Sequence, residues 1–118
     1  MYKNYIDLLY HILLECKYIK SVLTSEVSKE DFLADETLKR AIVRSLEVIG
    51  EATKKIPADI KLKWKDISWK SIAGMRDRLI HDYMGINYYI VWDVASNIIP
   101  NLSEQIEFVI SQEQYNQQ

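Results

Sequence analysis

The stretch ETLKRAIVRSLEVIGEATKKI, residues 36–56, carries the most regular apolar pattern in the chain and decides the fold class. Its apolar and small residues recur every three or four positions, at Leu38, Ile42, Ser45, Ile49, Ala52 and Ile56. This spacing places them on one face of an α-helix. The pattern predicts a central helix over 36–56, with Asp35 as its N-cap and Pro57 at its end.

The residues before this stretch show a second amphipathic pattern. Apolar residues at spacings of three and four predict a helix over 2–23. Cys16 lies within that pattern, and the sequence has no other cysteine, so we expect a small buried hydrophobe and no intramolecular disulfide. Ser28 and Asp31 resemble a capping box, which predicts a short helical turn through Leu33.

Two further helices are expected after Pro57. We expect a connector over 57–68 with a helical turn at 60–64. Ser68 is the expected N-cap of the next helix, over 69–83. The apolar stripe of that helix is Ile72, Met75 and Leu79.

Gly85 and Asn87 predict a break before the last helix, which we expect over 88–111. Its predicted core positions include Ile98, and Pro100 should kink or split it. The polar tail 112–118 is expected to fray.

The composition agrees with one helical domain over 1–118. With three glycines and two prolines in 118 residues, the chain has few helix-breaking positions, and no strand pattern or repeat is visible. The predicted fold is all-α, an up-and-down bundle of four main helices with short helical turns. No apolar run is long enough to span a membrane, and the first residues lack the order of a signal peptide, so we expect a cytoplasmic protein.

Charge is distributed unevenly along the chain although its net value is only −2. Residues 54–81 carry eight basic and three acidic side chains, whereas 82–118 contain acids and no lysine or arginine. The basic segment creates a local positive field that favours polyanions. Lys63, Lys65 and Lys70 are the candidates for contacting such a ligand, although a lysine-rich solvated loop would show the same composition.

The basic segment ends in RDRLIHDY, residues 76–83, the strongest candidate site. Fixed cations suit a phosphodiester, and a histidine moves protons near neutral pH. Asp77 stands one helical turn before His81, where its carboxylate can orient the imidazole and raise its pKa. Arg76 lies about 140° from His81 on an ideal helix, so Arg76 reaches around, the helix distorts, or a two-fold partner completes the site.

Structural roles would also account for these residues. His81 can cap the end of its helix, and Arg76 can form a salt bridge to Glu47 or Glu51. His11 is assigned no chemistry.

Other chemistry has less support in the sequence. The histidines and the cysteine lack zinc-site spacing, the glycines stand alone rather than in a phosphate loop, and no cofactor or metal is expected. Tyr88, Tyr89 and Trp92 could stack on bases, but core or interface packing is the favoured interpretation.

Three segments resemble the HepT-like toxins, a branch of the HEPN superfamily. Residues 44–52 are similar to the family's R-x-L-E-x-I-G-E-A, residues 69–83 to W-x-x-I-x-G-M-R-N/D-x-L-x-H-x-Y, and residues 90–92 to the helix that follows. The resemblance implies a HEPN-like bundle and a metal-independent endoribonuclease that is toxic to its own cell.

The resemblance also implies roles for residues and partners. Arg76 and His81 match the catalytic pair, and Tyr83 matches the tyrosine to which a minimal nucleotidyltransferase (MNT) antitoxin adds AMP. Asp77 and Arg78 are the supporting candidates because an ideal helix places them near His81. Many relatives have Asn where this chain has Asp77, which bears on the level of activity.

A homodimer with both motifs in one cleft is expected, because one histidine per chain supplies only one acid/base group. RNA is the expected substrate, and no DNA is expected. A non-catalytic nucleotide- or partner-binding module is the alternative function. A third possibility is that this chain neutralises a toxic nucleotidyltransferase.

Overall fold

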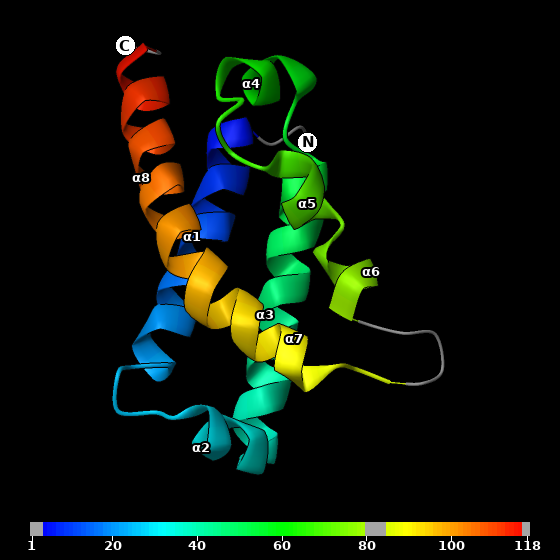
Figure 1. Ribbon diagram of the computed structural model, residues 1–118. Helices are drawn as coiled ribbons and strands as arrows, with labels where there is room; N and C mark the ends of the chain where they lie inside the picture. The colour runs from blue at the N-terminus through cyan, green and yellow to red at the C-terminus, as the bar shows by residue number, and fades with distance from the viewer. Residues whose placement is uncertain (1–3, 80–84, 117–118) are drawn as a thin grey trace.

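The computed structural model describes residues 4–79 and 85–116 and has an all-α fold. Helices α1, α3 and α8 form the body of the bundle, α2 and α4 lie at its two ends, and α5 to α7 lie along one side (Figure 1). The helices are α1 Tyr5–Val22, α2 Lys29–Ala34, α3 Glu36–Lys54, α4 Ala58–Lys63, α5 Trp69–Ala73, α6 Met75–Leu79, α7 Tyr88–Asp93 and α8 Ile99–Asn116, with a π-helical turn, η2, at Val94–Ile98.

Side-chain caps begin α2 and α3 where the sequence predicts them. Asp35 Oδ1 accepts a hydrogen bond from Leu38 N at 3.0 Å, which confirms the predicted N-cap of α3. Ser28 and Asp31 form the predicted capping box, each accepting from the other's backbone N–H. These bonds satisfy N–H groups that have no partner within the helix.

The core lies along α1, which contacts both α3 and α8. The face predicted for α3 is buried at Ile42, Ser45, Ile49 and Ala52, and α1 packs between α3 and α8. Cys16 is fully buried, as predicted, and burial raises the pKa of its thiol to about 12. The thiol is therefore protonated near neutral pH and packs as an apolar group.

The segment 69–79 is not one helix, so the prediction of a continuous helix over 69–83 is wrong. Gly74 separates α5 from α6, and Ser68 makes no side-chain cap hydrogen bond. Helix α5 lies close to α3, because a Cβ on Gly50 would stand 3.4 Å from the backbone oxygen of Ile72. Predicted residues 80–83 of this helix lie outside the described residues.

The break predicted before α7 is confirmed. Gly85 has a φ of 95°, a conformation that L side chains rarely adopt, and Asn87 caps α7 through its side chain.

The distortion predicted at Pro100 takes the form of η2. Proline lacks an N–H, and its ring clashes with the carbonyl four residues earlier, so a wider turn precedes it. Within that turn Ile99 N bonds to Val94 O. The extra residue rotates the helix, so Ile98 is 37 % exposed and Ile99 is fully buried in its place. The prediction that Ile98 belongs to the core is wrong.

The C-terminal segment is more ordered than the sequence indicates. The polar sequence predicts a frayed tail from residue 112, but α8 runs to Asn116, and Glu113 is only 3 % exposed. Glu113 accepts hydrogen bonds from Tyr5 Oη at 2.6 Å and Trp64 Nε1 at 2.8 Å, and it pairs with Lys63 Nζ at 2.8 Å. These contacts join α8 to α1 and to the end of α4.

Candidate functional site

Helix α6 carries the described half of the Arg76–Tyr83 motif. Met75 is 2 % and Leu79 is 1 % exposed, so one face of this short helix is fixed against the core. Arg76, Asp77 and Arg78 lie between them and are all exposed. His81 and Tyr83 fall outside the described residues, so the predicted contact between Asp77 and His81 does too.

Arg76 is oriented by an ion pair with the central helix. Its Nε lies 3.4 Å from Glu47 Oε2 on α3, which is one of the two partners that the structural interpretation predicted. The other candidate, Glu51, pairs with Lys54 on its own helix. The Arg76 side chain remains 52 % exposed. A guanidinium has five N–H donors, so this single contact leaves donors available for an anion.

Arg78 takes a different direction from Arg76. Two residues along an α-helix are separated by about 200°, so the two guanidinium groups leave α6 on different sides. Arg76 turns toward Glu47, whereas Arg78 lines a cleft between α5–α6 and the η2–α8 segment. Helix α6 therefore does not bring these two predicted site residues together.

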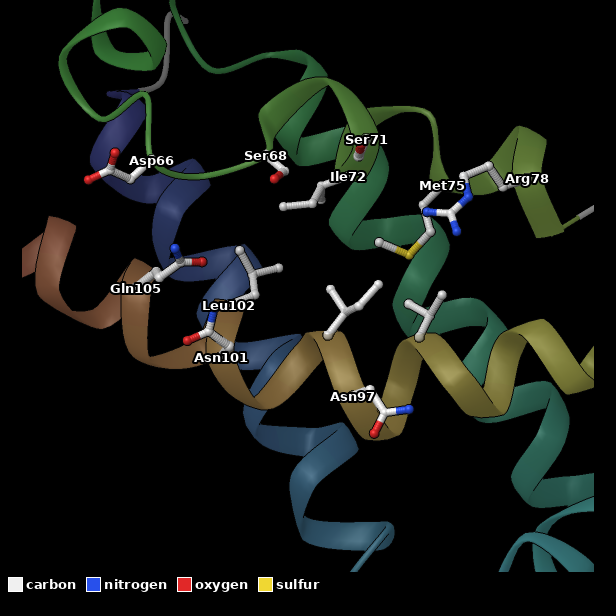
Figure 2. Close-up of a pocket in the computed structure, with 12 residues that line it drawn as sticks. Asp66, Ser68, Ser71, Ile72, Met75, Arg78, Asn97, Asn101, Leu102 and Gln105 are labelled. Carbon is white, nitrogen blue, oxygen red and sulfur yellow. The ribbon is translucent and has the colours of Figure 1, made fainter.

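That cleft has a volume of about 320 Å³. Figure 2 shows the Arg78 side chain at one end and Asp66 with Gln105 at the other, while Ser68 and Ser71 form one edge. The described residues lining it are Asp66, Ser68, Ser71, Ile72, Met75, Arg78, Val94, Asn97, Ile98, Asn101, Leu102 and Gln105.

The amide side of this cleft is not among the site residues predicted from the sequence. Asn97, Asn101 and Gln105 follow each other at intervals of four residues, which places them along one side of a helix. That spacing was visible in the sequence, but the cleft appears only when α5 and α6 pack opposite.

The three lysines predicted to approach a polyanion differ in their surroundings. Lys63 pairs with buried Glu113 and lies 5.9 Å from the Trp64 ring centroid, so it also holds the fold together. Lys65 and Lys70 are exposed.

The aromatic residues of α7 largely pack against protein. The Trp92 ring lies 5.4 Å from that of Phe32, and Lys39 Nζ lies 4.6 Å from the Tyr88 ring centroid, which confirms the packing interpretation for these two rings. Tyr89 is 63 % exposed, and Lys29 lies over its ring at 4.9 Å.

Residues 4–79 and 85–116 offer neither a metal site nor a membrane-spanning helix. No group of three or more histidine, cysteine, aspartate or glutamate side chains is placed to hold a metal ion. No described helix has the length and apolar character required to cross a membrane.

Comparison with known proteins identifies the family. The model of the "Ribonuclease HepT-like" family matches residues 12–109. The chain belongs to the HepT-like ribonuclease family. It is an enzyme of the endoribonuclease class, and its substrate is RNA.

Curated relatives agree with this assignment. The chain is 46 % identical over 103 residues, 87 % of this chain and 91 % of the relative, to a provisionally named RNase of Caldanaerobacter subterraneus subsp. tengcongensis. The chain is also 45 % identical over 102 residues to a provisionally named RNase of Methanocaldococcus jannaschii. This match covers 86 % of this chain and 84 % of the relative.

A relative from Thermococcus cleftensis carries the name "Probable ribonuclease HepT". The identity is 43 % over 84 residues, 71 % of this chain and 76 % of the relative. No solved structure matches the chain significantly.

Proposed function

We propose that this HepT-like ribonuclease cleaves RNA without a metal ion, through Arg76 and His81. The observation that carries the proposal is the R-x4-H-x-Y motif, which begins on an anchored helix with an exposed arginine in a chain of this family. Arg76 keeps guanidinium donors available while Glu47 fixes its direction.

The reaction uses the nucleophile that RNA itself carries. A base removes the proton of the ribose 2′-OH, the 2′-oxygen forms a bond to phosphorus, and the bond to the 5′-oxygen breaks. The departing 5′-oxygen takes a proton, and a 2′,3′-cyclic phosphate remains. His81 serves as an acid/base group, and Arg76 stabilises the charge that develops on the phosphoryl oxygens.

Two proton transfers in one reaction favour a homodimer. One chain offers a single motif histidine, whereas a two-fold pair offers two, together with two copies of Arg76. In the proposed dimer, the segments 69–83 and 88–111 lie near the two-fold axis, and both motifs face one cleft. Light scattering that gives a monomer at tens of micromolar would contradict this arrangement.

The proposed biological role is the toxin of a toxin–antitoxin pair. A minimal nucleotidyltransferase antitoxin would add AMP to the hydroxyl of Tyr83 and place a bulky anion where the RNA phosphate approaches. Mass spectrometry after co-expression with such an enzyme should show AMP-sized additions on the Tyr83 peptide. A Tyr83→Phe protein that the antitoxin still neutralises would remove this part of the proposal.

A non-catalytic binding module is the second candidate, since a purely structural Arg76 would make the same ion pair with Glu47. Incubation of purified protein with RNA in EDTA separates the two. We expect cleavage by the wild type and by His11→Ala, the matched histidine variant, and none by His81→Ala with an unchanged helical spectrum. Full activity of His81→Ala, or loss of wild-type cleavage in EDTA, would contradict the mechanism.

A further inference from the structure

We propose that the cleft beside α6 binds one nucleotide of the RNA and selects bases that carry an exocyclic amino group. The inference rests on the proposed ribonuclease function and adds a base preference to it. Arg78 lines the cleft and leaves α6 on a different side from Arg76, so a nucleotide held there would lie apart from the phosphate that Arg76 contacts.

The size and lining of the cleft fit a nucleotide. Its volume of about 320 Å³ lies at the small end of ligand pockets, which run from roughly 300 to 1,000 Å³. This space suits one nucleotide and not a longer segment. Ile72, Met75 and Leu102 supply an apolar surface for a flat ring, and the amide and hydroxyl groups around it can bond to its edge.

The charges give the cleft a direction. Arg78 is a cation at one end, and Asp66 is a carboxylate at the other, beside Gln105 (Figure 2). Asp66 and Gln105 also line a smaller adjoining pocket together, which places these two side chains near each other. A phosphate therefore belongs at Arg78, and the base edge lies toward Asp66, whose side chain is turned outward in Figure 2 and has to rotate to meet it.

The carboxylate decides which bases fit. Ionised aspartate only accepts hydrogen bonds, so Asp66 favours a base edge that presents an N–H₂ group. Cytosine, adenine and guanine each have an exocyclic amino group with two N–H donors, whereas uracil offers one N3–H between two carbonyl oxygens. Repulsion between those oxygens and Asp66 should disfavour uracil.

The amides complete the recognition. Asn97 donates from Nδ2 to Asp93 Oδ1 at 2.7 Å, which fixes its amide and leaves its carbonyl oxygen as an acceptor. Asn101 and Gln105 lie one and two turns further along the same side of the helix, so they can pair with the donors and acceptors beside the amino group.

The test is an NMR titration of the intact protein with AMP, CMP, GMP and UMP, which needs no cleavage. The first three should bind about ten-fold more tightly than UMP, and they should shift the side-chain amide signals of Asn101 and Gln105. Asp66→Asn should remove the preference against UMP. Arg78→Gln should weaken all four nucleotides about ten-fold, because the phosphate contact is common to them.

Matched variants outside the cleft serve as controls. Gln114→Ala on α8 and Asp59→Asn on α4 are exposed and should leave all four affinities unchanged, whereas Gln105→Ala should lower them. Equal binding of all four nucleotides, or a preference that survives Asp66→Asn, would overturn the inference. Selective binding without RNA cleavage would refute the proposed catalysis and leave the cleft assignment in place.

Discussion

The carboxylate of Glu113 and the arginines of α6 show two different uses of charge in one small bundle. Glu113 is 3 % exposed and has three donors around it, from α1 and from the end of α4. Arg76 is half exposed with one carboxylate partner, and Arg78 borders an open cleft. The first charge has its hydrogen-bonding capacity met within the protein and joins helices. The two arginines keep hydrogen-bond donors available for a ligand, so we expect substitutions of Arg76 or Arg78 to alter activity more than stability.

Arg76→Ala should produce the largest effect on activity. Loss of a group that stabilises transition-state charge typically lowers the rate by about 10²–10³-fold. Stability should change by less than about 1 kcal/mol, because the ion pair with Glu47 is half exposed. Cleavage assays and thermal melts measure the two effects, and Arg40→Ala, an exposed arginine on α3, is the control. A strongly destabilised but fully active Arg76→Ala protein would show that Arg76 supports the fold rather than the reaction, which is the opposite of this expectation.

Glu113→Ala should show the opposite result. Removing the shared acceptor of Tyr5 and Trp64 should lower the free energy of unfolding by about 2–4 kcal/mol, since each hydrogen bond to a charged group contributes roughly 1.5–3 kcal/mol and solvent replaces part of the loss. Cleavage per folded molecule should not change. Denaturant melts against Glu107→Ala, whose exposed carboxylate pairs with Lys17 at 3.6 Å, test this expectation. Equal stability of the two variants would contradict it.

The same carboxylate should make stability depend on acidity. Burial by itself raises the pKa of Glu113, but the hydrogen bonds from Lys63, Tyr5 and Trp64 outweigh burial and hold the pKa below its ordinary value of 4.5. A lowered folded-state pKa contributes stability above the unfolded pKa, and that contribution is lost as pH falls through the folded pKa. Melting temperatures measured from pH 6 downward should therefore fall below about pH 4.5. The fall should be shallower in Glu113→Gln, and identical profiles would contradict the assignment.

The smallest effect concerns two serines at helix starts. Ser28→Ala removes a capping hydrogen bond and should cost about 1 kcal/mol. Ser68→Ala should leave the free energy of unfolding almost unchanged, because Ser68 makes no cap hydrogen bond. Urea melts of both variants against the wild type measure the difference. If Ser68→Ala lost more unfolding free energy than Ser28→Ala, Ser68 would have to stabilise the fold through a contact other than a helix cap.

Local signals explain why much of the fold was predictable. The face of α3, the caps at Ser28 and Asp35 and the break at Gly85 each depend on residues within about one or two helical turns. The motif on α6 was visible for the same reason, since its spacing is a property of the chain. The position of Cys16 in the core followed from its apolar neighbours.

The errors have a common cause in packing between distant segments. The division at Gly74 accompanies the close approach of α5 to α3, and the π-helical turn before Pro100 exchanges Ile98 for Ile99 in the core. Proline predicted a distortion, but the distortion alone does not determine which residue the core accepts.

The sequence by itself determined the first three helices, most of the buried faces and the motif, because periodicity, capping and residue chemistry act over short distances. Only the tertiary structure decided that Glu113 joins three segments, that Arg76 pairs with Glu47 rather than Glu51, and that Arg78 borders a cleft with Asn101. Each of these contacts joins residues far apart in the chain. A charged side chain looks the same in the sequence whether it will face solvent, a buried partner or a ligand, and the packing of helices makes that choice.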